Sequence, residues 1–315
     1  MKKLLYLIFV LFCYSACVNK NITVDCPIID VLNSAGKYKR VYYSDYFSSI
    51  ELFPLETSDD CLLEYFRHYS LFDCKRILFN DEFIFISSRG ILYSYDYSGK
   101  FLYQIGGKGQ GPREYTRLFD IFFNTDKPTI FISDYHKILE YDFNGAYIRS
   151  IPKPIIEDEN AMFCSYIADN LFIGQLSISS GKNKYRYCIF DGNGVTVAFL
   201  PNYTYFNRSG FRFINYDGAL QPIRVDENNY LKDYVNDTIY ILENLTMKPA
   251  YVYKLGKYTF SKEYLEKPID DRLENKAFVI RHLLGTQNYF FIPGIPPPDF
   301  AAHFTLISYE FISRP

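Results

Sequence analysis

The feature that most constrains the fold of this 315-residue chain is a β-hairpin that recurs along it. Each copy has an alternating apolar run, an Asp-x-Ser/Asn-Gly turn and a second alternating run. The copies read ILYSYDYSGKFLYQI, ILEYDFNGAYIRSI and YRYCIFDGNGVTVAFL, and their turn glycines, Gly99, Gly145 and Gly194, are 46 and 49 residues apart. Alternation of period two predicts half-buried strands, and Asn-Gly or Ser-Gly between them predicts a tight hairpin turn.

Two further short apolar runs precede each hairpin. They occupy residues 76–80 and 83–88, 120–124 and 129–134, and 163–168 and 170–175. Four strands in a unit of about 46 residues are typical of a β-propeller, whose blades bury their faces against one another. We therefore predict an all-β chain, a propeller of four-stranded antiparallel blades.

The units on either side of these three are less regular. A fourth unit ends in the runs at 237–242 and 249–255, and a fifth begins at 278–284 and 288–292. The segment SIELFPLE, residues 49–56, precedes the first full unit. We predict that it supplies the outer strand that closes the ring against the last blade.

These segments carry a resemblance to a known family. SIELFPLET, YDYSGKFLYQIGGKGQGPREY and FISDYHKILEYDFNGAYIRSI resemble the six-bladed β-propeller lipoproteins of Bacteroidetes, relatives of the NHL-repeat propellers. The family's Gly-x-Gly-x-Gly-Pro-x-Glu-Tyr stretch is matched by Gly107, Gly109, Gly111, Pro112, Glu114 and Tyr115. NDTIYIL…KPAYVYKLGK, residues 236–257, resembles the later blades. The resemblance implies the fold and says little about activity.

The C-terminal part departs from that family. Six blades need more chain than follows Gly256, and residues 293–315 contain five prolines. We expect a six-bladed type with about five blades present and an incomplete last blade; a smaller closed ring of five blades is the alternative. The predicted organisation is a signal peptide, a tether, the propeller, and a proline-rich tail or incomplete blade, at residues 1–16, 17–40, 41–292 and 293–315.

The N-terminus has the pattern of a secretory signal. Lys2 and Lys3 precede an apolar run at residues 4–12, and Ser15-Ala16-Cys17 resembles a bacterial lipoprotein box. Lipidation of Cys17 would tether the protein to a membrane without spanning it; a plain signal peptide cut nearby is the alternative. The residues after Cys17 lack an early acidic cluster, which favours the outer membrane with the protein facing the periplasm.

Composition limits the partners. The net charge is −2, which gives no electrostatic footprint for nucleic acid. The chain has 31 Tyr, 29 Phe and no Trp, and β-sheets favour such aromatic residues. Five cysteines remain beyond Cys17, without metal-site spacing. We expect most of them to be small buried residues, with a Cys61–Cys74 disulfide as the alternative.

The stretch GGKGQGPREY, residues 106–115, invites a phosphate-loop interpretation. Gly106 and Gly111 have the right separation, but Pro112 and Arg113 occupy the Lys and Ser/Thr positions, and a strand follows in place of a helix. We predict an inter-blade connection. Its exposed side chains are candidates for rim or ligand contacts, and these are Lys108, Arg113, Glu114 and Tyr115.

Other polar motifs are weighed in the same way. Asp96, Asp142 and Asp191 precede the turn glycines and are expected to bond the turn backbone rather than calcium. Asp134 and His136 lie in a strand-to-strand turn, and the resemblance to NHL-type lactonases and lyases makes them a candidate channel site; a surface turn is the alternative. No metal site and no cofactor is predicted. DTI, residues 237–239, matches an O-glycosylation pattern of Bacteroidetes that would modify Thr238.

The function that the sequence favours is binding. We predict a lipid-anchored cell-envelope propeller that binds a glycan or polypeptide partner through one open face and is not an enzyme. A metal-dependent lactonase or lyase with its site at the central channel is the alternative, by analogy of fold alone. A degenerate truncated copy without activity is the second alternative.

Overall fold

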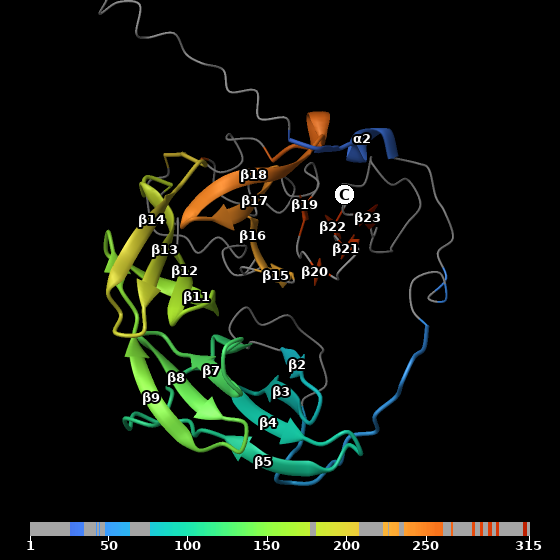
Figure 1. Cartoon of the computed structure of the whole chain (residues 1–315), viewed down its shortest axis with the longest axis vertical. Helices are drawn as coiled ribbons and strands as arrows, with labels where there is room; N and C mark the ends of the chain where they lie inside the picture. The colour runs from blue at the N-terminus through green and yellow to red at the C-terminus, as the bar shows by residue number, and fades with distance from the viewer. Residues whose placement is uncertain are drawn as a thin grey trace, which may run out of the picture.

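The computed structural model contains four antiparallel blades in a propeller-like ring (Figure 1). It describes residues 26–34, 42, 44, 48–63, 76–176, 181–207, 223–225, 227–232, 236–260 and 266, and the backbone of 279–280, 284–285, 289–291, 294–295 and 311–313. Within each blade the strands follow chain order from the centre of the ring outwards. The predicted four-stranded antiparallel blade is therefore confirmed.

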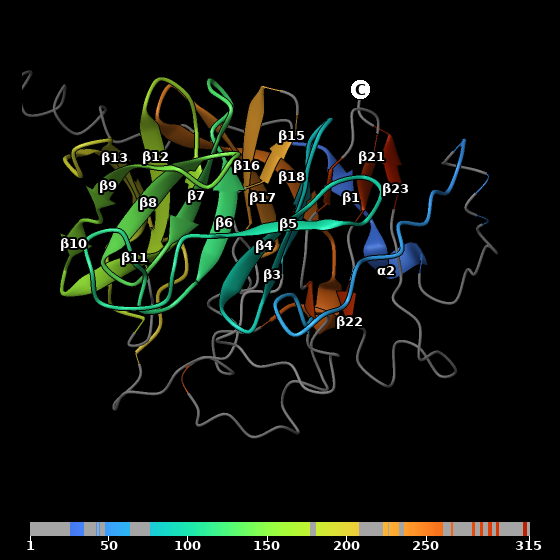
Figure 2. The same ribbon diagram turned by 90° about the horizontal axis from the view of Figure 1, so that it is seen from below.

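Blades I and II are regular four-stranded sheets. Blade I consists of β2 (Ile77–Phe79), β3 (Ile84–Ser88), β4 (Ile91–Tyr95) and β5 (Phe101–Ile105). Blade II consists of β6 (Asp120–Phe123), β7 (Thr129–Ser133), β8 (Lys137–Asp142) and β9 (Tyr147–Pro152). Figure 2 shows blade I from the side, with β5 outermost.

Blades III and IV each gain one short strand. Blade III consists of β10 (Ile155–Ile156), β11 (Glu159–Tyr166), β12 (Leu171–Leu176), β13 (Tyr185–Asp191) and β14 (Thr196–Pro201), with β10 innermost. Blade IV consists of β15 (Ile223–Val225), β16 (Asn228–Lys232), β17 (Thr238–Glu243) and β18 (Thr246–Tyr253), with β1 (Ile28–Ile29) outermost.

The last strands form two small sheets after blade IV. One pairs β19 (Val279–Ile280) with β22 (Gly294–Ile295), and the other joins β20 (Leu284–Gly285), β21 (Tyr289–Phe291) and β23 (Phe311–Ser313). These sheets do not add a four-stranded blade within the described residues. The six-blade count therefore stays a prediction.

The core lies between the blades, because each central strand is buried on both faces. In β7, Ile130 and Ile132 pack with residues of blade I, whereas Phe131 packs with residues of blade III. In β12, Phe172 packs towards blade II and Ile173 towards blade IV. Alternate residues thus serve opposite interfaces, which is why these strands are apolar at nearly every position.

The hairpin turns have the predicted chemistry. Gly99 and Gly145 have φ of 83° and 85°, which a side chain would oppose. The Asp96 carboxylate accepts hydrogen bonds from the backbone N–H groups of Ser98 and Lys100 at 2.8 and 3.1 Å. Hydrogen bonds led by the Ser98 hydroxyl hold the pKa of Asp96 below its ordinary value. These aspartates therefore stabilise turns, as expected.

The N-terminal segments differ from the prediction in one respect. Residues 49–56 form no strand, so the prediction of an outer strand there is wrong. They lie instead against the hairpin of blade I, where the Glu56 N–H donates to the Gly99 carbonyl at 2.7 Å and Phe53 and Leu55 pack on the blade. The strand that pairs with blade IV comes from within the predicted tether, because β1 runs parallel to β18. The helix α2 (Val31–Ser34) follows β1.

The described cysteines are free thiols. Cys61, Cys164 and Cys188 are buried, in agreement with the expectation of small core residues. The Cys61 thiol donates to the Glu56 carbonyl at 3.4 Å, so it does not form the alternative disulfide. Cys74 lies outside the described residues.

Candidate functional site

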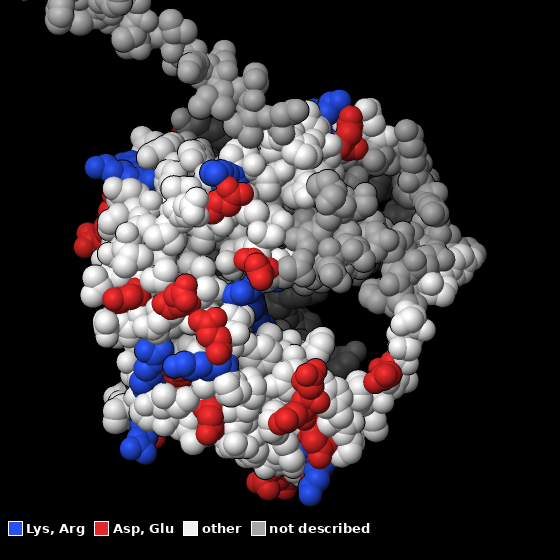
Figure 3. Space-filling view, in the orientation of Figure 1, with Lys and Arg blue, Asp and Glu red and all other residues white. Residues whose placement is uncertain are grey.

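The segments that join successive blades lie at one end of the strands. Antiparallel strand order places them beside the turns between the second and third strands, and we call this surface the connection face. Its described segments are residues 106–119, 134–136, 153–154, 202–207 and 236–237. The opposite surface carries the turns at Gly99, Gly145 and Gly194, and we call it the hairpin face. Figure 3 shows that the ring is hollowed near its centre and that charges of both signs surround the hollow.

The glycine-rich loop at 106–115 is closed by its own hydrogen bonds. The Gly109 N–H donates to the Tyr115 carbonyl and the Tyr115 N–H to the Gly107 carbonyl, both at 3.0 Å. The Glu114 carboxylate accepts from the Gly111 N–H at 2.9 Å. The loop's backbone groups therefore bond one another, which supports a connection between blades rather than an anion cradle.

The four predicted rim residues divide into two groups. Lys108, Arg113 and Glu114 are exposed on the connection face. The Arg113 guanidinium lies 5.5 Å from the centre of the Tyr147 ring. Tyr115 is instead fully buried between blades I and II, and burial raises the pKa of its hydroxyl. Its ring anchors the loop, so it is not a rim contact.

Asp134 holds the connection that follows this loop. Its carboxylate accepts hydrogen bonds from the N–H groups of Thr116, Arg117 and Tyr135 at 3.1, 3.0 and 2.7 Å, and from the Thr116 hydroxyl at 2.8 Å. The residue is only 3% exposed, whereas the neighbouring His136 is exposed. These contacts support the surface-turn interpretation. Among the described residues, no three His, Cys, Asp or Glu side chains are grouped as metal ligands.

Asp134→Ala should destabilise the protein by about 3 kcal/mol, because three backbone donors and one hydroxyl lose a charged acceptor in a buried place. Asp134→Asn keeps one acceptor oxygen and should cost about half as much. His136→Ala, the matched control at an exposed position, should change stability by less than about 0.5 kcal/mol. Urea unfolding measures all three, and an unchanged midpoint for Asp134→Ala would contradict the turn-stabilising role.

A cluster that the sequence did not predict lies beside Asp134 near the inner strands. The Phe119 ring lies 5.9 Å from that of Tyr135 and 6.5 Å from that of Phe163, and the Arg117 guanidinium lies 5.3 Å from its centre. We call Arg117, Phe119, Tyr135, His136 and Phe163 the inner-rim cluster. Tyr135 is 41% exposed, so the cluster presents an aromatic and a cationic group to solvent.

A buried lysine supports this cluster from below. The Lys153 ammonium donates to the Met162 carbonyl at 2.9 Å, and the Lys153 N–H donates to the His136 carbonyl at 2.8 Å. Burial lowers the pKa of Lys153, and the nearby Cys164 and Asp120 oppose that shift. The Asp120 carboxylate lies 3.0 Å from the Arg76 guanidinium of blade I. These contacts tie blades I, II and III together beneath the connection face.

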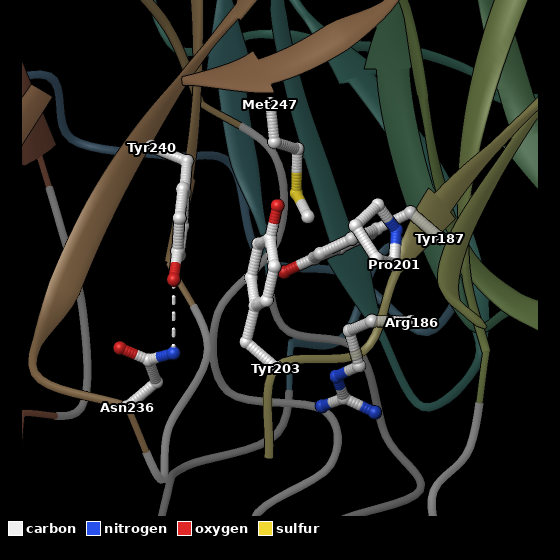
Figure 4. A pocket seen from close by; sticks show the side chains of 7 residues that line it. All are labelled: Arg186, Tyr187, Pro201, Tyr203, Asn236, Tyr240 and Met247. Atoms are coloured by element: carbon white, nitrogen blue, oxygen red, sulfur yellow. Dashed lines mark hydrogen bonds between the residues drawn. The ribbon is translucent and has the colours of Figure 1, made fainter. Parts of the chain in front are cut away.

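A pocket opens between blades III and IV (Figure 4). It holds about 210 Å³ of empty space, part of it open to solvent. Its lining residues come from β13, β14, β17, β18 and the adjoining connections, and they are Arg186, Tyr187, Pro201, Tyr203, Asn236, Tyr240 and Met247. We call it the inter-blade pocket. The Tyr203 and Tyr240 rings stack at 5.4 Å with an angle of 21° between their planes.

The remaining predicted sites are not tested by these contacts. Thr238 is half-buried at the start of β17, and its N–H donates to the Asn236 side chain at 2.8 Å. Cys17 lies outside the described residues. Within the described part of the chain, no helix is long and apolar enough to cross a membrane.

Fold and site together define a β-propeller whose connection face carries exposed aromatic and cationic side chains. The chain belongs to the family described as a domain of unknown function, DUF4934, whose profile matches residues 26–309. No curated protein matches the chain. The NHL-repeat-like lipoprotein resemblance is not confirmed at that level of detail and stays a prediction.

Solved structures share the propeller fold. A Bacteroides fragilis protein named as exported is 18% identical with a TM-score of 0.61, over 79% of this chain and 70% of its own. A DUF4221 family member from Bacteroides vulgatus is 12% identical, with a TM-score of 0.47 over 72% of each chain. The Porphyromonas gingivalis protein PorZ, a surface component of the type-IX secretion system, is 9% identical, with a TM-score of 0.39 over 76% of this chain and 26% of its own.

Proposed function

We propose that this chain is a cell-envelope binding protein, anchored by a lipid on Cys17, whose propeller binds a glycan or polypeptide partner through the connection face without catalysing a reaction. The signal pattern before Cys17 supports export, and so does the likeness to the exported Bacteroides fragilis propeller. The outer membrane, with the ring in the periplasm, is the proposed location.

One observation carries the binding proposal. Exposed aromatic and cationic side chains gather on a connection face whose backbone is firmly held. Tyr135, Tyr203 and Tyr205 are 41%, 56% and 53% exposed there, and Arg117 is exposed beside Tyr135. Tyrosine and arginine are enriched at binding surfaces, since each combines a rigid contact area with hydrogen-bond donors.

Rigid support makes this surface suitable for recognition. Asp134 fixes the backbone that presents Arg117 and Tyr135, as described above. In the next connection, the Asn202 side chain donates to the Asn183 carbonyl at 3.1 Å and accepts from the Thr204 N–H at 2.9 Å. Groups held in place before binding lose less conformational entropy when a partner arrives.

Site-specific photo-crosslinking in cells tests the proposal. A p-benzoylphenylalanine in place of Tyr135 or Tyr205 should give a discrete adduct of higher mass. The same group in place of Asn144 or Asn193, exposed on the hairpin face, should give none. Cys17→Ser should move the protein out of the membrane fraction, because the lipid supplies the attachment. Adducts from the hairpin-face positions alone, or from neither face, would contradict binding through the connection face.

A further inference from the structure

The inter-blade pocket has a flat aromatic wall that is open to solvent. Tyr203 is 56% exposed although one face of its ring stacks on Tyr240, which is 8% exposed. Asn202, which precedes Tyr203, is 1% exposed and fixes this connection through the two hydrogen bonds given above. The ring is therefore held in place by its neighbours and offers its outer part to a ligand.

The polar groups of the pocket favour an anion. Arg186 is 2% exposed, and its guanidinium donates to the Leu176 carbonyl at 2.6 Å, which fixes its orientation. Figure 4 shows this guanidinium beside Tyr203 at the pocket. The seven lining residues include no Asp or Glu, so nothing in the lining balances the positive charge. Arginine pairs with carboxylates through planar, charge-assisted hydrogen bonds.

The size and the remaining side chains favour a sugar. Pockets for drug-sized ligands hold about 300–1,000 Å³, so the 210 Å³ here suit one ring rather than an extended molecule. Asn236 and the tyrosine hydroxyls can exchange hydrogen bonds with hydroxyl groups; the Asn236 amide already donates to the Tyr240 hydroxyl at 3.0 Å. The side chain of an acidic peptide has a carboxylate but no ring to cover Tyr203.

We infer that the inter-blade pocket binds a sugar residue that carries a carboxylate, a uronic acid, with its ring against Tyr203 and its carboxylate towards Arg186. This inference rests on the proposed function, because it names the ligand class of one part of the connection face. The uronic acid is either the end of a glycan or a free sugar.

Titration calorimetry of the full chain in detergent tests the inference with glucuronate and glucose, which differ at one carbon. Glucuronate should bind with a Kd of about 1 mM, as expected for so small a ligand, and glucose at least ~10-fold more weakly. Tyr203→Ala should weaken glucuronate binding roughly 10-fold, whereas Tyr203→Phe should retain it. Tyr205→Ala, in the same connection but outside the pocket, is the matched control and should bind as the parent does.

Arg186→Gln should remove the preference for glucuronate over glucose, with circular dichroism confirming that this buried variant folds. A uronate-terminated oligosaccharide that binds more tightly than the free acid would identify a glycan as the source, and equal affinities would identify the free sugar. Equal binding of glucose and glucuronate by the parent would overturn the inference. So would tighter binding of a glutamate-containing tripeptide, equal losses for Tyr203→Ala and Tyr205→Ala, or no heat up to about 20 mM glucuronate.

The crosslinking experiment separates the two proposals. Adducts from Tyr135 and Tyr205 in a protein that ignores glucuronate would overturn only the uronate inference. A protein without adducts and without sugar binding would contradict the proposed function as well.

Discussion

Phe172→Ala should lower the free energy of unfolding by roughly 3–5 kcal/mol, the largest effect expected of a single side chain in this protein. The Phe172 ring is fully buried between blades II and III. It contacts the rings of Phe122, Phe131, Tyr166 and Phe190, at centroid distances of 6.5, 5.2, 5.3 and 5.6 Å. Truncation removes these contacts and leaves a cavity that the stiff surrounding sheets cannot close.

Thermal and urea unfolding of the Phe172→Ala protein measure this effect, with an expected fall in Tm of roughly 10 °C. Phe199→Ala is the matched control, because Phe199 lies on the outer strand of the same blade and is 47% exposed. It should cost about 1 kcal/mol. Equal losses for the two variants would mean that the interface between blades II and III is not the main source of stability.

Gly99→Ala should be the most damaging of the turn-glycine substitutions. A Cβ at Gly99 would lie 1.9 Å from the Pro54 carbonyl oxygen, so residues 53–56 would have to move away from blade I. The hydrogen bond from Glu56 N–H to Gly99 and that from Phe101 N–H to the Glu56 carboxylate, 3.0 Å long, would be lost with them. We expect a loss of about 3–4 kcal/mol, of which about 1 kcal/mol reflects the positive φ itself.

Gly145→Ala separates the two contributions. Its φ of 85° matches that of Gly99, but a Cβ there would meet the Tyr103 ring at an ordinary distance of 3.6 Å. It should therefore cost only about 1 kcal/mol. Urea unfolding gives both values, and hydrogen exchange at the Glu56 amide should accelerate in Gly99→Ala alone. Equal losses would show that turn strain, and not the packing of residues 53–56, limits position 99.

The sequence predicted the blades because their signals are local. A hairpin such as β8–β9 needs only two alternating runs and the turn at Gly145, and all of these lie within 16 residues, from Lys137 to Pro152. The short strands β1 and β10 could not be predicted, because two residues show no periodicity. Their pairing depends on partners that tertiary structure places beside them.

The candidate site was predicted only in part. Lys108, Arg113 and Asp134 were singled out from one loop and one turn, and the structure places them on the same face. Tyr115 ends a polar, glycine-rich stretch, which gave no sign that its ring packs between blades. The inter-blade pocket joins Tyr203 to Tyr240, and such long-range pairs leave no pattern in a single sequence.

The pairing of β1 with β18 has a consequence for the order in which this protein acquires its structure. The Lys254 ammonium lies 2.9 Å from the Asp30 carboxylate, across a sequence separation of 224 residues. During synthesis the first strand must therefore wait, without its mate, until nearly the whole ring has emerged. Contacts between such distant parts of a chain form slowly. Sealing of the fourth blade's outer edge should thus be among the latest steps of maturation, and an arrested nascent chain would display that edge bare.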